Sequence, residues 1–190
     1  MKNLLILHGS YGNPDKNWNR YLEGEAKKKG YVVHIPQLEH IDKLDLEKTF
    51  KTLMDKGYIN SDTTIVGHSS GATYILGILQ RLPESISIKK AILVAGFIDD
   101  KLTKELFKHV PKAHYAKLFP KKWDWVKIKK SCKEFIFIYS ENDPYVQTRH
   151  AKTLNQKLGG KLVAFSNAFH FSINTGGERF KKFPELVNFI

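Results

Sequence analysis

The stretch Thr63-Thr64-Ile65-Val66-Gly67-His68-Ser69-Ser70-Gly71-Ala72 decides the fold class of this chain, because two structural patterns meet in it. Its first four residues are β-branched and predict a buried strand. Beyond the second glycine, apolar residues recur at helical spacing and predict a helix that ends near Pro83. A buried strand that turns directly into a helix is typical of a parallel sheet covered by helices.

The same alternation of short apolar runs and helical segments continues on both sides of this stretch. We expect strands at residues 4–7, 31–35, 63–66, 91–95, 135–139 and 162–165. We expect helices at residues 16–29, from Asp42 to Gly57, at 72–82, around 102–110, at 148–158 and from Pro184 onward. The chain is therefore predicted to be a single α/β domain over residues 1–190. Its sheet should have about six mostly parallel strands, helices on both faces and no large lid domain.

The segment Gly67-His68-Ser69-Ser70-Gly71 fits the G-x-S-x-G pattern of a nucleophilic serine on a sharp turn between a strand and a helix. Glycines on both sides of Ser69 leave room for such a turn, and the following helix directs backbone N–H groups toward developing negative charge. We therefore predict that Ser69 is a catalytic nucleophile. The alternative is a glycine-bounded turn in which the serines are incidental.

A nucleophilic serine needs a histidine base and a carboxylate that orients the histidine. Of the eight histidines, His170 is the best placed, because it follows the last predicted strand, at the edge where parallel sheets bind ligands. Asp143 follows the fifth predicted strand, and we predict that it is the third member. The alternative carboxylates near the same edge are Asp99, Asp100 and Glu141.

The loop His8-Gly9-Ser10 follows the first predicted strand and should reach the same edge. We predict an oxyanion hole formed by the backbone N–H of Gly9 or Ser10 together with that of Ser70, while His8 braces the loop. The aromatic residues expected to line an acyl pocket are Trp18, Phe119, Trp123, Trp125 and Phe169. The alternative is that Trp123 and Trp125 only anchor the irregular segment at residues 96–130.

Composition limits the remaining function classes. The chain is 42% hydrophobic and 26% charged, which is typical of a globular protein, and its apolar runs are too short for a membrane span or signal peptide, so we expect a cytoplasmic location. With Cys132 as the only cysteine, we expect no disulfide, and we expect no metal or organic cofactor. The net charge of +12 comes mainly from scattered lysines, so we expect no nucleic-acid partner. The partner that the predicted serine nucleophile leads us to expect is a small acyl substrate.

Four segments carry a family resemblance: residues 67–72, residues 118–129 with Trp123-Asp124-Trp125-Val126-Lys127-Ile128-Lys129, Asn142-Asp143-Pro144-Tyr145 and His170-Phe171. In these segments the chain resembles the small serine hydrolases of the retinoblastoma-binding protein nine type, and the similarity extends over nearly the whole chain. The resemblance implies a compact α/β-hydrolase fold that hydrolyses acyl compounds. It also implies that the triad positions are Ser69, Asp143 and His170.

The chain departs from that family at Ala168-Phe169, where the family commonly has glycine, so we expect a tighter or more apolar loop before His170. The leading hypothesis is a hydrolase of carboxylic esters, thioesters or amides that works through an acyl-enzyme on Ser69. The competing hypothesis is a catalytically weak or inactive hydrolase-fold protein that binds a protein or nucleic acid through its basic and aromatic surface.

Overall fold

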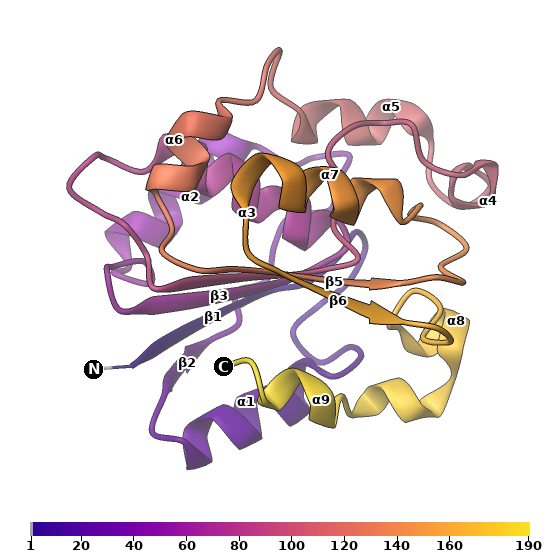
Figure 1. Ribbon diagram of the computed structural model, residues 1–190, viewed down its shortest axis with the longest axis horizontal. Coiled ribbons are helices and arrows are strands. Elements are labelled where there is room, and N and C mark those ends of the chain that lie inside the picture. The colour runs from indigo at the N-terminus through magenta and orange to yellow at the C-terminus, as the bar shows by residue number, and fades with distance from the viewer. Residues whose placement is uncertain (1) are drawn as a thin grey trace.

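The computed structural model describes residues 2–190 and shows a sheet of six parallel strands between two layers of helices (Figure 1). The strands are β1 (Asn3–Leu7), β2 (Val32–His34), β3 (Thr63–His68), β4 (Lys90–Val94), β5 (Phe135–Ser140) and β6 (Lys161–Phe165). Their order across the sheet is β2-β1-β3-β4-β5-β6, and every neighbouring pair is parallel. The predicted α/β fold is confirmed.

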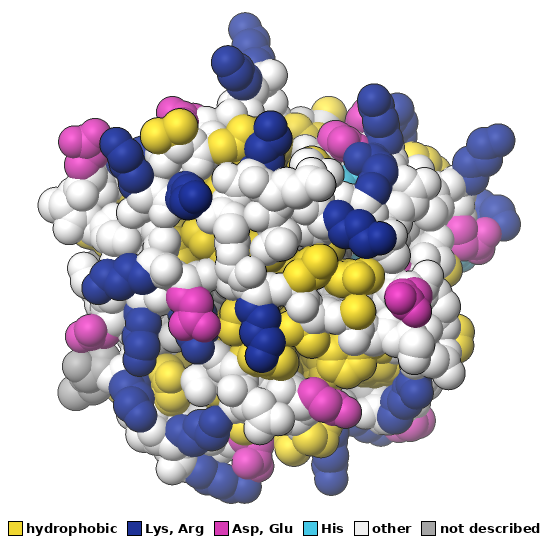
Figure 2. All heavy atoms as spheres, in the orientation of Figure 1, with side chains coloured by type: hydrophobic (Ala, Val, Ile, Leu, Met, Phe, Trp, Pro, Cys, Tyr) yellow, Lys and Arg dark blue, Asp and Glu magenta, His cyan; other side chains and the backbone are white. Residues whose placement is uncertain are grey.

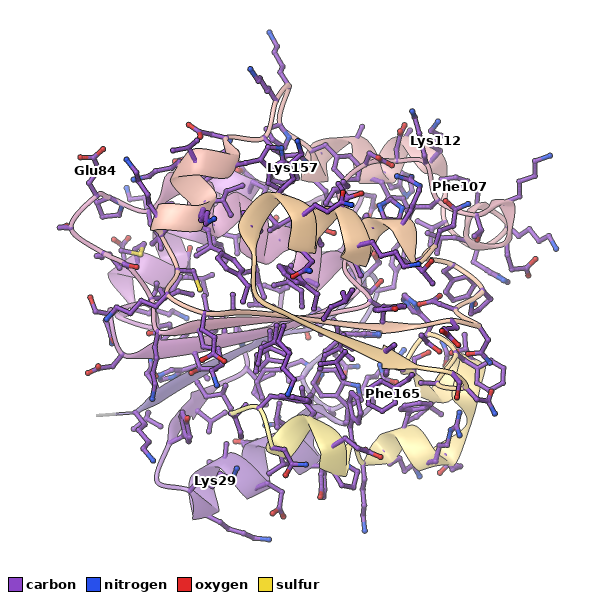
Figure 3. All side chains as sticks on the ribbon, in the orientation of Figure 1. Lys29, Glu84, Phe107, Lys112, Lys157 and Phe165 are labelled. Carbon is purple, nitrogen blue, oxygen red and sulfur yellow. The ribbon has the colours of Figure 1, made fainter. Side chains whose placement is uncertain are left out.

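Helices cover both faces of the sheet. One face carries α2 (Leu46–Asp55), α3 (Ser70–Arg81), α6 (Trp125–Lys130) and α7 (Arg149–Leu158). The opposite face carries α1 (Asn19–Lys28), the 3-10 helix η2 (Glu178–Lys181) and α9 (Pro184–Val187). Figure 3 shows Lys157 of α7 and Phe165 at the end of β6 on opposite sides of the sheet.

The first strand shows why the sheet is apolar throughout. Leu5 and Leu7 belong to the hydrophobic cluster beneath α3, whereas Leu4 and Ile6 belong to the cluster beneath α1, and all four are fully buried. Successive strand residues point to opposite faces of a sheet. Because both faces are covered, every position of the strand must be apolar, and the short uninterrupted runs in the sequence follow from this.

One predicted helix start is corrected. The helix expected from Asp42 begins instead at Leu46, and Asp45 caps it, because Asp45 Oδ1 accepts a hydrogen bond from the Lys48 N–H over 3.0 Å. Asp42 cannot cap the helix because it lies inside a turn that is closed by the Lys43 N–H on the His40 carbonyl over 2.8 Å. The capping residue type was predicted, but its position was three residues too early.

Short helices surround the edge of the sheet at which the strands end. In Figure 1, α4 (Lys104–Phe107) and α5 (Lys112–Tyr115) lie on the α3 side of that edge and α8 (Ile173–Gly176) on the other. The 3-10 helix η1 (Ala116–Leu118) continues from α5. Between β4 and β5 the chain holds only α4, α5, η1 and α6, so no large lid domain is inserted there.

Candidate active site

Ser69 lies at the turn between β3 and α3 in a backbone conformation that residues other than glycine rarely adopt. Its φ is 56° and its ψ is −122°. Such a conformation costs on the order of 1–3 kcal/mol and persists only where the surroundings enforce it. The Ser69 N–H donates to the Val94 carbonyl over 2.9 Å, and the Ser69 carbonyl accepts from the Ala72 N–H over 3.0 Å. These bonds hold the residue in the turn on both sides.

Gly67 and Gly71 make this turn sterically possible. A β-carbon at Gly67 would lie 2.6 Å from the Gly71 carbonyl oxygen. A β-carbon at Gly71 would overlap the Leu7 carbonyl oxygen and lie 2.6 Å from that of His8. All of these neighbours are backbone atoms, which cannot rotate away, so a larger residue at either position would force α3 away from the sheet.

The side chains of Ser69, His170 and Asp143 form a continuous chain of hydrogen bonds. His170 Nδ1 lies 2.8 Å from Asp143 Oδ2, and His170 Nε2 lies 2.9 Å from Ser69 Oγ. A carboxylate can only accept, so His170 carries its proton on Nδ1 and its Nε2 accepts from the Ser69 hydroxyl. The His170 and Asp143 side chains are only 7% and 2% exposed, so little water competes for these bonds.

The two aspartates that were alternatives to Asp143 form ion pairs with basic residues instead. Asp99 accepts from the Arg149 guanidinium over 2.8 Å, and Asp100 pairs with Lys112 over 3.1 Å. The third rival, Glu141, is exposed. The structure therefore brings Asp143 to His170, and none of the three alternatives.

The carboxylate of Asp143 is oriented by its own turn. Its Oδ1 accepts the backbone N–H groups of Tyr145 over 2.8 Å and of Val146 over 3.0 Å. This leaves Oδ2 for the imidazole of His170. The two oxygens of one side chain thus have separate partners, and the carboxylate cannot rotate without losing bonds on both sides.

Ser140 and Asn142 connect the turn that carries Asp143 to the loop that carries His170. The sequence reasoning assigned neither residue a role. Asn142 Oδ1 accepts from the Ser140 hydroxyl over 2.7 Å and from the Phe169 N–H over 2.8 Å. Ser140 Oγ also accepts the Ala168 N–H over 2.9 Å. The only sequence signal for this link was the presence of Asn142 beside Asp143 in the family-like segment.

The loop that carries His170 is tight. Phe169 and Phe171, on its two sides, have φ values of 49° and 50°. Left-handed backbone costs a residue with a β-carbon roughly 1–2 kcal/mol and costs glycine almost nothing. Phe169 therefore holds a strained conformation that the glycine common in the family would adopt at almost no cost. The loop is closed by the Phe171 N–H, which donates to the Ala168 carbonyl over 3.0 Å.

His68 packs beneath this loop. Its Nε2 donates to the His170 carbonyl over 2.8 Å, and the two rings lie 5.0 Å apart between centroids. Burial, aided by the neighbouring His170, lowers the pKa of His68 to about 3, so the ring is neutral near pH 7. The sequence did not predict this contact between His68 and the loop that carries His170.

The loop after β1 lies directly against the turn that carries Ser69. A β-carbon at Gly9 would be 3.2 Å from the Ser69 β-carbon. Ser10 Oγ donates to Ser70 Oγ over 2.9 Å. The residues predicted to supply oxyanion-hole N–H groups, Gly9, Ser10 and Ser70, are therefore brought together beside Ser69.

His8 braces this loop through both ring nitrogens. Its Nδ1 donates to the Gly9 carbonyl over 2.9 Å, and its Nε2 accepts from the Leu38 N–H over 3.0 Å. Burial lowers the pKa of His8, which keeps the ring in the neutral form that can accept from Leu38. The bracing role that the sequence suggested agrees with these contacts.

A cavity of about 490 Å³ opens over Ser69 and His170. One part of its wall is apolar and includes Leu106 and Val110 from the α4 region. Another part is polar and includes Asn17, from the loop before α1. The cavity is of the size that small-molecule sites usually have.

The predicted pocket lining is corrected, because the residues that line this cavity do not include Trp18, Phe119, Trp123, Trp125 or Phe169. Trp18 is fully buried, and its Nε1 donates to the Phe171 carbonyl over 3.1 Å. Trp123 Nε1 donates to the Ile98 carbonyl over 2.8 Å. Large aromatic side chains stabilise most when their rings are buried and their N–H groups are bonded. Trp18 meets both conditions, whereas Trp123 is half-buried and has its N–H bonded in the body of the fold.

The other three aromatic residues also pack away from the cavity. Trp125 lies beside Trp123 at 5.8 Å between ring centroids, which supports the alternative that these tryptophans anchor the segment. Phe119 packs against the buried ring of Phe97 at 6.0 Å. Phe169 lies under the guanidinium of Arg179 at 5.6 Å.

The described residues, 2–190, show neither a metal cluster nor a membrane-spanning helix. No group of three or more His, Cys, Asp and Glu side chains in this range is placed to hold a metal ion. No helix in the same range has the length and apolar character that crossing a bilayer requires. Cys132 is buried, and burial raises the pKa of its thiol to about 12, which makes it a poor nucleophile.

The basic residues are dispersed. Figure 2 shows Lys and Arg side chains scattered over the visible face, with Asp and Glu among them, and not gathered into one patch. Several are paired with acidic neighbours on the same helix, as Lys27 is with Glu23 over 2.7 Å. On the face that Figure 2 shows, the basic side chains are therefore spread out and not concentrated at one place.

Comparison with known proteins identifies relatives. The family model described as serine hydrolase matches residues 4–188. Serine hydrolase RBBP9 of Rattus norvegicus is 29% identical over 133 residues, which cover 70% of this chain and 62% of that protein. The alignment therefore spans less than two thirds of the length of that curated relative. These matches confirm the resemblance that the sequence segments suggested.

Solved structures share the fold. The product of the ydeN gene from B. subtilis superposes with a TM-score of 0.85 at 24% identity, and the match covers 100% of this chain and 96% of that one. The Pyrococcus furiosus esterase Pf2001 superposes with a TM-score of 0.64 at 17% identity, covering 99% of this chain and 81% of that one. At these identities the likeness shows a common fold and nothing finer.

Proposed function

The chain belongs to the serine hydrolase family, and from that premise we propose that it hydrolyses acyl compounds through a covalent acyl-enzyme on Ser69. The observation that carries this proposal is the pair of hydrogen bonds that joins Asp143, His170 and Ser69 beside a cavity. The substrate class is carboxylic esters, thioesters or amides, which share the carbonyl carbon that a serine attacks. The proposal treats the whole chain as one catalytic domain.

In the first half of the reaction, the Ser69 oxygen attacks the carbonyl carbon of the substrate. As the new C–O bond forms, the hydroxyl proton passes to His170 Nε2, which already lies 2.9 Å from Ser69 Oγ. Asp143 keeps the other ring nitrogen protonated and stabilises the imidazolium that results. The C–O, C–S or C–N bond to the leaving group then breaks, and His170 donates its Nε2 proton to that group.

The negative charge that develops on the carbonyl oxygen needs donors. The Gly9 or Ser10 N–H and the Ser70 N–H are proposed to supply them, since these backbone segments lie on the two sides of Ser69. Ser70 begins α3, so the positive end of the helix dipole acts at the same point. Each such donor contributes about 3–4 kcal/mol of transition-state stabilisation in other acyl-transfer enzymes.

In the second half, water replaces the leaving group. His170 Nε2 takes a proton from the water as its oxygen attacks the acyl carbon, and the proton then returns to Ser69 as the acyl C–O bond breaks. The products are the free acid and the regenerated enzyme. All of the protein groups needed are the ones named above.

The experiment that tests the proposal combines a covalent probe with turnover. A fluorophosphonate should label the folded wild-type chain at Ser69, identified by mass spectrometry of the peptide. The Ser69→Ala variant should lose labelling and, by analogy with other triads, on the order of a millionfold in kcat for a simple 4-nitrophenyl ester. Turnover that survives in Ser69→Ala would overturn the assignment.

The same experiment separates enzyme from binding module. A folded wild-type chain that neither reacts with the probe nor turns over any ester would favour a hydrolase-fold protein that binds through its surface. In that case, retention on nucleic acid that falls steeply with salt would identify the basic residues as the binding surface. On the face that Figure 2 shows, those residues are dispersed and form no single patch that would support this alternative.

A further inference from the structure

The charged groups that line the active-site cavity are of one sign. Among the described residues, no Asp or Glu lines it, whereas Lys16 does. The nearest catalytic carboxylate, Asp143, is covered by His170 and is only 2% exposed. From this lining we propose that the cavity binds acyl substrates that carry an anionic group, such as a carboxylate, and that Lys16 and Asn17 receive that group. This inference rests on the proposed function and adds the substrate class.

Lys16 is available as a binding cation. Its neighbour Asp15, which could have neutralised it, accepts instead from the guanidinium of Arg20 over 2.7 Å. Lys16 itself forms no ion pair within residues 2–190, although thirteen Lys, Arg or His contacts of that kind exist there. An unpaired ammonium at the wall of a cavity without carboxylates attracts anions to that wall.

Asn17 adds an oriented donor beside Lys16. Its backbone φ of 54° is left-handed, a conformation that asparagine adopts more readily than most residues. Its side-chain Oδ1 accepts from the Ile173 N–H over 3.0 Å, at the start of α8. With the oxygen occupied in this way, the amide NH₂ group has no hydrogen-bond partner within residues 2–190 and is free to donate to a substrate oxygen.

Another part of the cavity wall is apolar. Leu106, Val110 and Tyr115 lie in the α4–α5 region, on the other side of the sheet edge from α8, as Figure 1 shows. Glu105 of α4 does not line the cavity; it is bonded to Lys108 over 2.5 Å and lies 3.8 Å from the ring of the lining residue His109. A substrate with an apolar part and one anionic group matches both walls.

The test compares esters that differ in charge. The anionic acyl substrate is the mono-4-nitrophenyl ester of glutaric acid, and its neutral match is 4-nitrophenyl pentanoate. A second pair places the charge on the leaving group: the butyrate esters of 4-hydroxybenzoate and of 4-hydroxybenzamide. For each pair the measured quantity is the ratio of kcat/KM, anionic over neutral, at low and at high salt.

We expect the wild type to prefer the anionic member of at least one pair, and the pair that shows it identifies which side of the substrate carries the charge. Lys16→Glu should lower that ratio about tenfold, since it replaces an attraction at the cavity wall with a repulsion. Lys157→Glu on α7 makes the same change in net charge away from the cavity and should leave the ratio within about twofold of wild type.

The outcomes separate this inference from the proposed function. Ser69-dependent turnover with no anionic preference, or equal falls of the ratio in Lys16→Glu and Lys157→Glu, would overturn the inference and leave the proposed function standing. Absence of probe labelling and of turnover for every ester would overturn both.

Discussion

The buried imidazole of His68 donates a hydrogen bond to the backbone carbonyl of His170, over 2.8 Å. His68 is the last residue of β3 and precedes Ser69, whereas His170 lies more than a hundred residues later, between two residues with positive φ. The bond therefore connects the nucleophile turn to the loop that carries the proposed base. Because the acceptor is a main-chain carbonyl, the bond holds the backbone of His170 in position relative to Ser69.

Two replacements of His68 should distinguish the effect of its hydrogen bond on activity from the effect of its packing. In His68→Leu the buried His170 carbonyl loses its donor, which costs about 1–3 kcal/mol, and the loop can relax away from Ser69. We expect kcat to fall about tenfold or more with a smaller change in KM. In His68→Gln the side-chain amide can still donate, and most of the activity should return. The measurement is steady-state ester hydrolysis by both variants.

The pH profile provides the control for this variant. Because burial lowers the pKa of His68 to about 3, it does not titrate near neutrality, and His68→Gln should keep the wild-type shape of kcat/KM against pH. Equal loss in the leucine and glutamine variants would argue that ring packing, and not the hydrogen bond, is what matters.

Asp143→Asn should remove most of the activity without unfolding the protein. An amide NH₂ in place of Oδ2 would donate to His170 Nδ1 and leave the proton on Nε2, which then cannot accept from Ser69. By precedent from other Ser-His-Asp enzymes, kcat should fall about ten-thousandfold. Asp99→Asn, which alters the carboxylate paired with Arg149, is the matched control and should change kcat by less than about twofold. Similar losses in the two variants would contradict the assignment of Asp143.

Gly9→Ala should lower activity, whereas Gly24→Ala should raise stability. A β-carbon at Gly9 would stand 3.2 Å from the Ser69 β-carbon and 3.3 Å from the His68 carbonyl oxygen, so the loop must shift, and kcat should fall at least tenfold. Gly24 lies inside α1 with no atom within 4 Å of the added carbon, so alanine there should raise the free energy of unfolding by about 0.5–1 kcal/mol. Urea unfolding and ester hydrolysis on both variants check this. Full activity in Gly9→Ala would exclude a tight fit of this loop on the nucleophile.

Stability should fall as the pH drops below about 6.5, in part because of His150. This side chain is fully buried, accepts from the Ile98 N–H over 3.3 Å, and its Nε2 has no partner among the described residues. Burial, with the nearby Arg149 charge, lowers the pKa of His150 to about 4. Between the unfolded pKa and this value only the unfolded chain binds the proton, so unfolding is favoured by about 2 kcal/mol near pH 5.

The variant that tests this is His150→Gln, which keeps an acceptor for Ile98 but cannot titrate. The loss of unfolding free energy between about pH 7.5 and pH 5 should be roughly 2 kcal/mol smaller than in wild type. His8 and His68, whose pKa values are also lowered, leave the rest of the pH dependence in place. An unchanged pH dependence would show that folding does not lower the pKa of His150.

The sequence by itself determined the features that depend on neighbours along the chain. The strand, turn and helix around Ser69 could be predicted because β-branched residues, two glycines and an apolar stripe each determine the backbone conformation of residues close to them in the chain. Sheet class followed from strands that are apolar on both faces, such as residues 4–7. The same local reasoning placed Ser69, Asp143 and His170 at one edge of the sheet, and their catalytic roles stay predictions that the hydrogen-bond geometry supports.

Only the tertiary structure decided which side chains at that edge meet. Asp143 and Asp99 follow neighbouring strands and looked equivalent in kind, but Asp99 is taken by Arg149, a partner 50 residues away. Trp18 and Trp123 were expected in the pocket and instead bond to carbonyls in the body of the fold. Contacts between distant residues depend on how all the helices fill the space around the sheet, and no local pattern of residue types encodes that packing.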